Sequence, residues 1–556
     1  MTLLNKILYL LRKHSILRFA LFALILIFAT VISLLITFTA KKDPILTHIS
    51  PSIALPGDTI HIYGTNFGNN IEDSYVEIAG NRLTSSSYTS WTDNDIQIRL
   101  PQNITDGLVY VVTSAGKSQA VNFTNKATIP VLVKNDTQSS IPYISNITEK
   151  NGAIGKIITI FGKNFGTLRN NSKVLFSIES EEEEKHDFIS CSENNFDYEF
   201  WSNQEIRVRI PDGACSGDIY IATNNGNSNL YNLKISNMPG TKNFTDKKTF
   251  LLSVSANITA EDFKGSADII LRVPKPVITP SQRNIEIPVS NPEPIINDYM
   301  NTLVHQTTID SRQNNKFSVA HSFVVPVYSV KTNINSEKVK PYSKETLQHF
   351  SDYLKEDEIV PTNNPKITEL KTKIVSRVSN PYLQAKAIYN YFITHFNILP
   401  ELRAAEADVI ELIDNLQGDA YDYAMVFCAL ARNAGIPCIP ISGIYVDSNM
   451  EAHNHWWNEF YIEDFGWIPV DCSLGAGLEY ATTDYDDTNK SFYFGNLDSQ
   501  HVVFSRGWNK IKSTHIHGNI VYRPKTYALQ SIWEETSGEA QSYSSFWSNV
   551  YVTGVY

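Results

Sequence analysis

Two periods of hydrophobic residues follow one another along the chain. From residue 43 to residue 340, apolar and polar positions alternate in short runs broken by Gly and Asn, as in Ile60–Ile62 and Ile96–Ile98. This period of two predicts half-buried β-strands. From Ser343 the apolar residues, as in Leu347–Leu354, recur at helical spacing. The pattern therefore predicts a β-rich part followed by an α+β part.

An uncharged apolar run precedes both parts. It extends over 22 residues from Phe19 to Ala40, which is long enough to cross a bilayer as a helix. A cleaved signal peptide is the alternative, but its apolar region is usually shorter and ends at a small-residue site. Four basic residues precede the run, and such residues stay in the cytoplasm. We therefore expect a cytoplasmic N-terminus at 1–18, a transmembrane helix at 19–40, and a single-pass membrane protein with its remaining chain periplasmic or extracellular.

Composition narrows the function classes. The net charge of −11 and the absence of a basic patch argue against nucleic acid as a partner. A hydrophobic content of 42% is typical of packed globular domains, and 556 residues predict several of them. Five cysteines do not make a disulfide scaffold, although Cys191 and Cys215 could pair.

Residues 43–126 and 139–237 are two copies of one pattern. Each copy contains Gly-x-Asn-Phe-Gly, then Trp, then Ile-x-Ile/Val-Arg-x-Pro and finally Gly-x-Ser. This order resembles IPT/TIG domains, which are immunoglobulin-like sandwiches that act as spacers or binding modules. The second copy has twelve extra residues, including an acidic run at 181–184 that we interpret as a solvated loop.

Two further regions are predicted from pattern alone. Residues 245–340 contain more alternating runs and resemble the β-domain that often precedes bacterial transglutaminase cores. Residues 524–556, rich in aromatic residues and Ser, are expected to form a β or partly irregular tail.

Residues 341–523 contain three motifs that carry candidate chemistry. The first extends from Gly418 to Pro437, the second is the segment His-Trp-Trp-Asn-Glu-Phe-Tyr beginning at His455, and the third is Gly-Trp-Ile-Pro-Val-Asp ending at Asp471. Together they resemble the transglutaminase-like superfamily, which is related to the papain-type cysteine proteases. In that family a Cys, a His and an Asp form the catalytic triad. The resemblance implies that His455 and Asp471 are the base and its orienting carboxylate.

The family's cysteine is replaced. It lies fifteen residues before the Gly of Gly-Ile-Pro, and counting back from Gly435 gives Ala420. Ala424 and Arg432 match the family's flanking residues and support this register. The position begins a predicted helix, where the helix dipole would lower the pKa of a thiol. Alanine supplies no nucleophile, so the resemblance implies a domain without its catalytic thiol.

The other cysteines of this region are not expected to replace it. Cys428 lies two turns further along the same helix, about 12 Å from its start. We expect it to be buried, as free cysteines usually are. Cys438 follows Gly-Ile-Pro, where the resembled family commonly has a small residue, and is expected in the core. Cys472 adjoins Asp471, but neighbouring residues of a strand point to opposite faces.

Acidic and aromatic residues around the motifs suggest a ligand. The candidate binding residues are Asp419, Tyr421, Trp456, Trp457 and Glu459, which suit a peptide or glycan held by stacking and hydrogen bonding.

We expect no cofactor and no metal. One metal alternative stays open, because His453 and His455 would share a face of a strand and Asp471 or Asp419 could join them.

The sequence thus predicts a multidomain protein of a bacterial cell envelope. A transmembrane helix, two IPT/TIG sandwiches and a further β-sandwich precede an α+β transglutaminase-like domain. The leading function is a pseudoenzyme that binds peptide, protein or glycan of the envelope or exterior. An amidase or acyl transferase using a metal or an unrecognised nucleophile, and a structural spacer or adhesion protein, are the alternatives.

Overall fold

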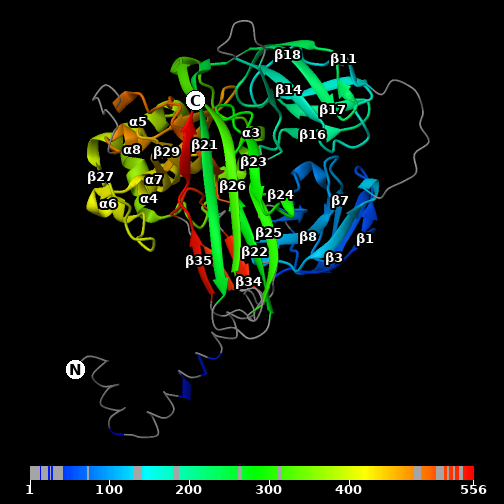
Figure 1. Cartoon of the computed structure of the whole chain (residues 1–556), viewed down its shortest axis with the longest axis horizontal. Helices are drawn as coiled ribbons and strands as arrows, with labels where there is room; N and C mark the ends of the chain where they lie inside the picture. The colour runs from blue at the N-terminus through cyan, green and yellow to red at the C-terminus, as the bar shows by residue number, and fades with distance from the viewer. Residues whose placement is uncertain are drawn as a thin grey trace. The chain divides into compact units, whose positions relative to one another are not determined.

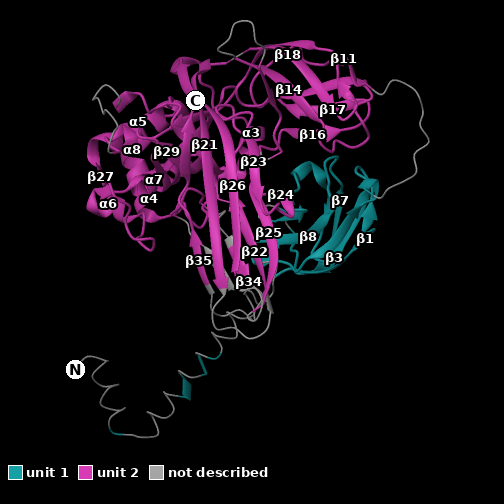
Figure 2. Ribbon diagram, viewed as in Figure 1, with its two compact units in different colours: residues 1–136 teal, residues 137–556 magenta. Residues whose placement is uncertain are grey.

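The structure is a computed structural model of the whole chain, and it divides into two compact units, residues 1–136 and 137–556 (Figure 2). The residues that it describes are 42–69, 71, 74–128, 141–179, 187–193, 195–236, 238–260, 266–310, 316–480, 490–508, 519–522, 525–529, 533–536 and 543–556, with Lys13, Ala23, Leu24, Ile27, Phe28 and Thr30.

The expected membrane anchor is corrected here. Most of the segment 19–40, and most of 1–18 before it, lies outside the described residues. Among the residues that are described, no helix is long and apolar enough to cross a membrane. The prediction of a single-pass membrane protein with a periplasmic or extracellular bulk is therefore wrong. An uncharged run of sufficient length shows only a capacity to span, and a spanning helix must also form.

The first unit contains a sandwich of two sheets, ordered β1-β3-β7-β6 and β2-β10-β8-β4-β5, with β9 paired to β8. Its strands are β1 (Ile45–Ser50), β2 (Ile53–Ala54), β3 (Thr59–Thr65), β4 (Tyr75–Ile78), β5 (Asn81–Arg82), β6 (Tyr88–Trp91), β7 (Asp95–Arg99), β8 (Gly107–Thr113), β9 (Gly116–Lys117) and β10 (Val121–Asn125). The alternating Ile60, Ile62, Ile96 and Ile98 are fully buried between the sheets, as the period of two requires.

The second unit begins with a sandwich of the same strand order, β11-β13-β17-β16 and β12-β20-β18-β14-β15, with β19 paired to β18. Its strands are β11 (Tyr143–Ile147), β12 (Asn151–Gly152), β13 (Ile157–Lys163), β14 (Lys173–Ile178), β15 (Asp187–Ser190), β16 (Tyr198–Trp201), β17 (Glu205–Arg209), β18 (Ala214–Thr223), β19 (Gly226–Asn227) and β20 (Tyr231–Ile235). Trp201 Nε1 donates to the carbonyl of Phe165 at 3.2 Å, and Trp91 Nε1 donates to that of Phe67 at 3.2 Å. The repeated Phe and Trp therefore make the same hydrogen bond in both copies.

A third sandwich is built on the long antiparallel pair β21 and β26 (Figure 1). Its sheets are ordered β23-β26-β21-β35, with β36 also on β21, and β24-β25-β22-β34-β33. The strands are β21 (Gly240–Ala260), β22 (Ser266–Pro274), β23 (Glu286–Asn291), β24 (Ile296–Tyr299), β25 (Thr302–Asp310), β26 (Lys316–Ile334), β33 (Asn519–Tyr522), β34 (Trp533–Thr536), β35 (Tyr543–Trp547) and β36 (Tyr551–Val555). The C-terminal strands therefore complete this sandwich instead of forming a separate tail.

Helices and a four-stranded sheet of order β31-β30-β29-β32 form the α+β part. The elements are α3 (Lys344–His349), α4 (Pro365–Val375), α5 (Pro381–His395), β27 (Asn397–Ile398), α6 (Glu411–Asn415), β28 (Gln417–Gly418), α7 (Ala420–Asn433), β29 (Cys438–Val446), β30 (Ala452–Ile462), β31 (Gly466–Val470), α8 (Cys472–Gly475) and β32 (His501–Arg506). Pro381 opens α5, where its missing N–H costs little, and the Asn380 side chain caps that helix. Every residue of α7 from Ala420 to Arg432 is buried, so this helix is the core of the domain.

Ion pairs join the second sandwich to the α+β part and to strand β21 of the third sandwich. Lys156 Nζ lies 2.9 Å from Glu463 Oε1. Lys242 Nζ, on a side chain only 4% exposed, lies 2.6 Å from Asp212 Oδ1 and 2.6 Å from the carbonyl of Trp467. Because the Lys242 pair is buried, it resists water and salt more than a surface pair does.

Candidate functional site

The N-terminus of α7 is fixed by a capping box. Asp419 is the N-cap, and its Oδ1 accepts from the backbone N–H of Asp422 at 2.9 Å while Asp422 Oδ2 accepts from the N–H of Asp419 at 3.0 Å. Asp419 Oδ2 also accepts from the N–H of Arg403 at 2.7 Å. Ala420 is the first residue of the helix and is 4% exposed. The backbone therefore presents position 420 where a dipole would stabilise an anion, and the side chain there is a methyl group.

Strand β30 lies against this helix end. Tyr421 and Trp456 meet edge to face, with ring centroids 5.6 Å apart. His455 is the neighbouring residue of Trp456 and is fully buried. Strand β30 therefore places His455 one residue away from the contact with α7.

Asp471 follows β31 and caps the short helix α8. Its Oδ1 accepts from the backbone N–H groups of Ser473 and Leu474, both at 2.9 Å, and from Ser473 Oγ at 2.7 Å. Its Oδ2 lies 2.5 Å from His455 Nε2. Burial alone would raise the pKa of Asp471, but hydrogen bonds and charge from His455 and His501 outweigh it and hold the pKa far below its usual range.

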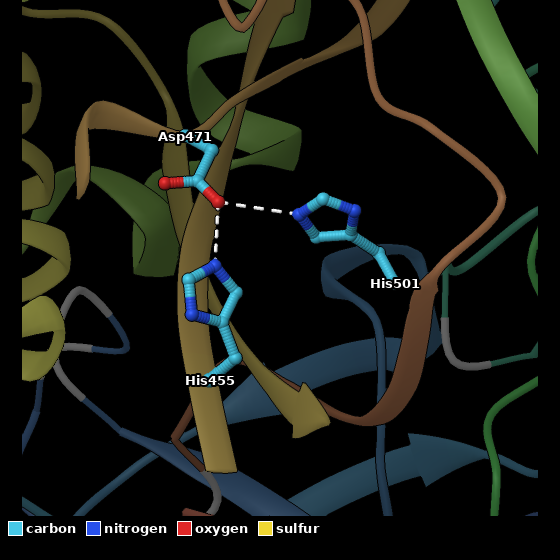
Figure 3. Close-up of side chains that lie close together, drawn as sticks. All are labelled: His455, Asp471 and His501. Atoms are coloured by element: carbon cyan, nitrogen blue, oxygen red, sulfur yellow. Dashed lines mark hydrogen bonds and ion pairs between the residues drawn. The ribbon is translucent and has the colours of Figure 1, made fainter. Parts of the chain in front are cut away.

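His501, at the start of β32, is a member of this cluster that the sequence analysis did not identify (Figure 3). Its Nε2 lies 3.2 Å from Asp471 Oδ2, and its Nδ1 lies 2.8 Å from Asp498 Oδ1. Burial lowers the pKa of His501, but the carboxylates of Asp498 and Asp471 raise it by more, so that the pKa is about 9. The only sequence signal was an Asp three residues before a His, which is too common to indicate a site.

Tyr480 holds the other nitrogen of His455. The Tyr480 hydroxyl lies 2.6 Å from His455 Nδ1. When the imidazole carries one proton, on Nε2 toward Asp471, its Nδ1 accepts from the Tyr480 hydroxyl, and when it carries two, Nδ1–H donates to the Tyr480 oxygen. Burial, followed by the charge of Asp471, raises the pKa of Tyr480 well above its usual value, so the phenol stays protonated.

Both ring nitrogens of His455 are thus engaged, one with a carboxylate and one with a phenol. The predicted pair of His455 and Asp471 is brought together. His453, the other histidine of the predicted metal set, instead lies 3.0 Å from Asp447 Oδ2 through its Nε2 and stacks on Tyr480 at 4.2 Å between centroids.

The predicted binding residues are mostly packed inside. Trp456 and Trp457 are each 1% exposed, and the Trp457 ring lies 5.0 Å from that of His501. Asp419 is fully buried in its capping role, and Glu459 Oε2 is paired with Arg506 at 2.6 Å. A ligand-binding role for these four residues stays a prediction.

The fifth predicted residue, Tyr421, lines a concave surface that encloses a pocket with a volume of about 460 Å³. Its lining includes the acidic residues Glu356, Asp357, Glu358 and Asp408. Arg432 partly neutralises them through its 2.6 Å ion pair with Asp357. The surface is therefore acidic and next to position 420 in the chain.

All five cysteines are free thiols, so Cys191 and Cys215 are not paired. Cys428 Sγ is directed at the carbonyl of Cys438 at 3.4 Å. Burial raises the pKa of the Cys438 and Cys472 thiols well above the ordinary value. Protonated, buried thiols are poor nucleophiles.

Comparison with protein families agrees with the three motifs. The model of the transglutaminase-like superfamily matches residues 368–472, which include α7, β30 and Asp471. This segment is a transglutaminase-like domain. The model of the IPT/TIG domain matches residues 44–128, the sandwich of the first unit. The chain therefore joins an IPT/TIG domain to a transglutaminase-like domain, as the motifs predict.

Two curated relatives cover only parts of the chain. An uncharacterized protein of Haemophilus influenzae is 28% identical over 168 residues, which cover 25% of this chain and 46% of that protein. A cyclomaltodextrin glucanotransferase of Paenibacillus macerans is 28% identical over 87 residues, 16% of this chain and 12% of the enzyme. The chain thus spans less than half the length of the curated relatives it matches.

Solved structures give a distant likeness. A candidate cysteine protease from Cytophaga hutchinsonii is 15% identical, with 57% of this chain and 91% of that chain covered and a TM-score of 0.34. The periplasmic domain of TgpA from Pseudomonas aeruginosa is 15% identical, with 39% and 72% covered and a TM-score of 0.24. At such scores neither structure bears on what this chain does.

Proposed function

We propose that the transglutaminase-like domain binds a peptide or protein segment without transforming it. The observation that carries this proposal is that Ala420 supplies no nucleophile while Tyr480 bonds His455 Nδ1. In a triad the imidazole nitrogen opposite the carboxylate takes the proton of the nucleophile. Here that nitrogen is bonded to a phenol that stays protonated, so the base has no thiol to activate.

The acidic concave surface beside Tyr421 is the proposed binding surface. Its four carboxylates, of which Arg432 offsets one, favour a segment with Lys or Arg side chains. Tyr421 adds an aromatic edge on which a peptide can pack. The proposed ligand class is therefore a basic peptide or a basic segment of a protein.

Two measurements on the full chain test the proposal. Fluorescence anisotropy would compare a labelled Lys-rich peptide with a Glu-rich peptide of the same length. We expect binding of the first alone, weakened by salt and by Asp408→Asn but not by Asp414→Asn, an exposed carboxylate paired with Lys366. Equal binding of both peptides, or none, would overturn the binding proposal.

Turnover is tested separately with a glutamine peptide and a dansylated amine. We expect neither ammonia release nor amine incorporation above the buffer level. Incorporation would overturn the proposed inactivity while leaving the peptide-binding result to stand or fall by itself.

A second candidate, an amidase, is favoured by one observation, the 2.6 Å contact between Tyr480 and His455. A nucleophile, a base and an orienting carboxylate are in hydrogen-bond reach in this order. The Tyr480 oxygen would attack an amide carbonyl and pass its proton to Nδ1, the amine would leave with that proton, and water would hydrolyse the aryl ester. Turnover abolished by Tyr480→Phe would support this function, whereas unchanged turnover in that variant would exclude it.

A further inference from the structure

We propose that His455, Asp471 and His501 form a binding site for one divalent transition-metal ion, with Zn²⁺ as the best-suited ion. The side chains come from β30, from the N-cap of α8 directly after β31, and from the start of β32. One ligand atom from each lies within 4.8 Å of the others, and all three residues are buried. This site is independent of the proposed function, because it requires neither a nucleophile nor a peptide.

The donor set matches the chemistry of such ions. Two imidazole nitrogens and one carboxylate oxygen are a common set for Zn²⁺ and its first-row neighbours. Ca²⁺ and Mg²⁺ prefer oxygen ligands, so this set selects against them. The three side chains point toward one another in Figure 3, with both contacts made to the same oxygen, Asp471 Oδ2.

The atoms that would not touch the ion are already held by outer partners. His501 Nδ1 bonds Asp498, and His455 Nδ1 bonds Tyr480, whose hydroxyl can accept as well as donate. Asp471 Oδ1 accepts three hydrogen bonds from Ser473 and Leu474. Second-shell carboxylates and hydroxyls of this kind orient metal-bound histidines. Oδ2 and the two Nε2 atoms are therefore left facing a common point.

Charge and distance allow the exchange of protons for an ion. Two N–H···O contacts, of 2.5 Å and 3.2 Å, converge on Oδ2. To bind an ion, each Nε2 must give up its proton: a ring with two protons releases one to solvent, and a ring with one proton moves it from Nε2 to Nδ1. Zn–ligand distances of about 2.0–2.2 Å put tetrahedral donors about 3.3 Å apart. His455 Nε2 must then withdraw from Oδ2 by less than about 1 Å.

The ion would join strands β30 and β32 to the N-cap of α8. Its protein donors fill three tetrahedral positions and leave the fourth to a water molecule. The three donors come together in a buried site only when the domain is folded, so the ion would bind the folded state alone. Such an ion stabilises the folded domain.

The test uses the untagged full chain, stripped with a chelator and dialysed against ZnCl₂. Inductively coupled plasma mass spectrometry should find about one Zn²⁺ per chain, and titration calorimetry should give its affinity. We expect His501→Gln to weaken binding at least 100-fold and Asp498→Asn about 10- to 100-fold. The matched control is His453→Gln, which changes a histidine on the same strand and should bind as the parent chain does.

Two further readouts keep the result decisive. Co²⁺ in place of Zn²⁺ should give the visible absorption of a four-coordinate site, lost in His501→Gln. If circular dichroism shows that His501→Gln is unfolded, Asp498→Asn alone decides, because it keeps both histidines. Less than about 0.1 ion per chain, equal affinity in Asp498→Asn, or loss of binding in His453→Gln would overturn the proposal.

Discussion

The hydroxyl of Tyr480 lies 2.6 Å from Nδ1 of His455, on the opposite side of the imidazole from Asp471. The ring thus has a partner on each nitrogen and is fully buried. In a triad the imidazole nitrogen opposite the carboxylate serves the nucleophile, and here that nitrogen is held by Tyr480 while α7 begins with Ala420. The contact therefore makes Tyr480 the residue to remove when position 420 is tested.

A thiol introduced at position 420 should reveal whether the frame still works. We expect the thiol of Ala420→Cys to have a pKa lowered by the helix N-terminus alone, because Tyr480 occupies His455 Nδ1. In Ala420→Cys/Tyr480→Phe, the released imidazole should lower the thiol's pKa by about 1 unit or more below that of the single variant. Mass spectrometry of labelling against pH measures this shift.

Ala424→Cys is the control for that experiment, because it places a thiol one turn along the same buried helix. It should label slowly at every pH, with or without Tyr480. Identical pH profiles for the two variants at position 420 would contradict the role given to Tyr480.

Asp419 should act on stability. Its side chain caps α7 and accepts from the backbone N–H of Arg403, so Asp419→Ala takes this acceptor from one buried and one part-buried N–H group. We expect a loss of about 2–3 kcal/mol in the free energy of unfolding by urea. The capping variant Asn380→Ala, at the half-exposed start of α5, should cost about 1 kcal/mol. Equal losses in the two variants would mean that the hydrogen bond from Arg403 to Asp419 does not contribute to stability.

Lys242 should contribute more to the free energy of unfolding than Lys331, an exposed lysine of the third sandwich. Lys242→Met removes the cation from a buried pair with Asp212 and from the carbonyl of Trp467. We expect a loss of about 3–5 kcal/mol. Lys331→Met breaks a pair with Asp246 in which both side chains are more than half exposed, and it should cost less than about 1 kcal/mol. Thermal unfolding of the two variants compares them, and similar melting temperatures would refute the difference.

The local motifs were readable from the sequence, and their confirmation has a physical reason. Gly-Ile-Pro ends a helix, and Gly435 takes a positive φ of 81° there, so the motif's spacing reflects helix geometry. The transglutaminase-like and IPT/TIG domains were recognised by such spacings, and the family models confirm both. His455 and Asp471 also followed from spacing, although their roles stay predictions.

The features that the sequence did not predict depend on contacts between residues that are distant along the chain. His501 reaches Asp471 from 30 residues further along the chain, and β36 pairs with β21 across about 300 residues. No period or motif records such pairing, because each strand carries only its own alternation. The prediction of a membrane-spanning helix was contradicted for another reason: it was made from hydropathy alone, and no helix among the described residues is long and apolar enough to cross a membrane.

Acid should weaken the third sandwich through a pair of buried histidines. His305 and His321 face each other with their Nε2 atoms 2.9 Å apart, each 1% exposed. Burial lowers the pKa of both to about 4, and for His321 the neighbouring His305 adds to the effect. Between pH 6.5 and 4 the unfolded chain therefore binds protons that the folded chain excludes, so stability falls as the pH falls through this window.

The expected loss in the free energy of unfolding is roughly 2–3 kcal/mol per histidine between pH 7 and pH 4. Urea unfolding at pH 7.0, 5.5 and 4.0 measures this loss, and His305→Gln/His321→Gln should remove the contribution of both histidines to the pH dependence. The control His61→Asn changes a histidine of the first unit, outside the third sandwich, and the unfolding of the third sandwich should keep its pH slope in this variant. An equal slope in the double variant and the parent chain would show that the pair does not take up protons on unfolding, because the unfolded state of the variant has lost both sites.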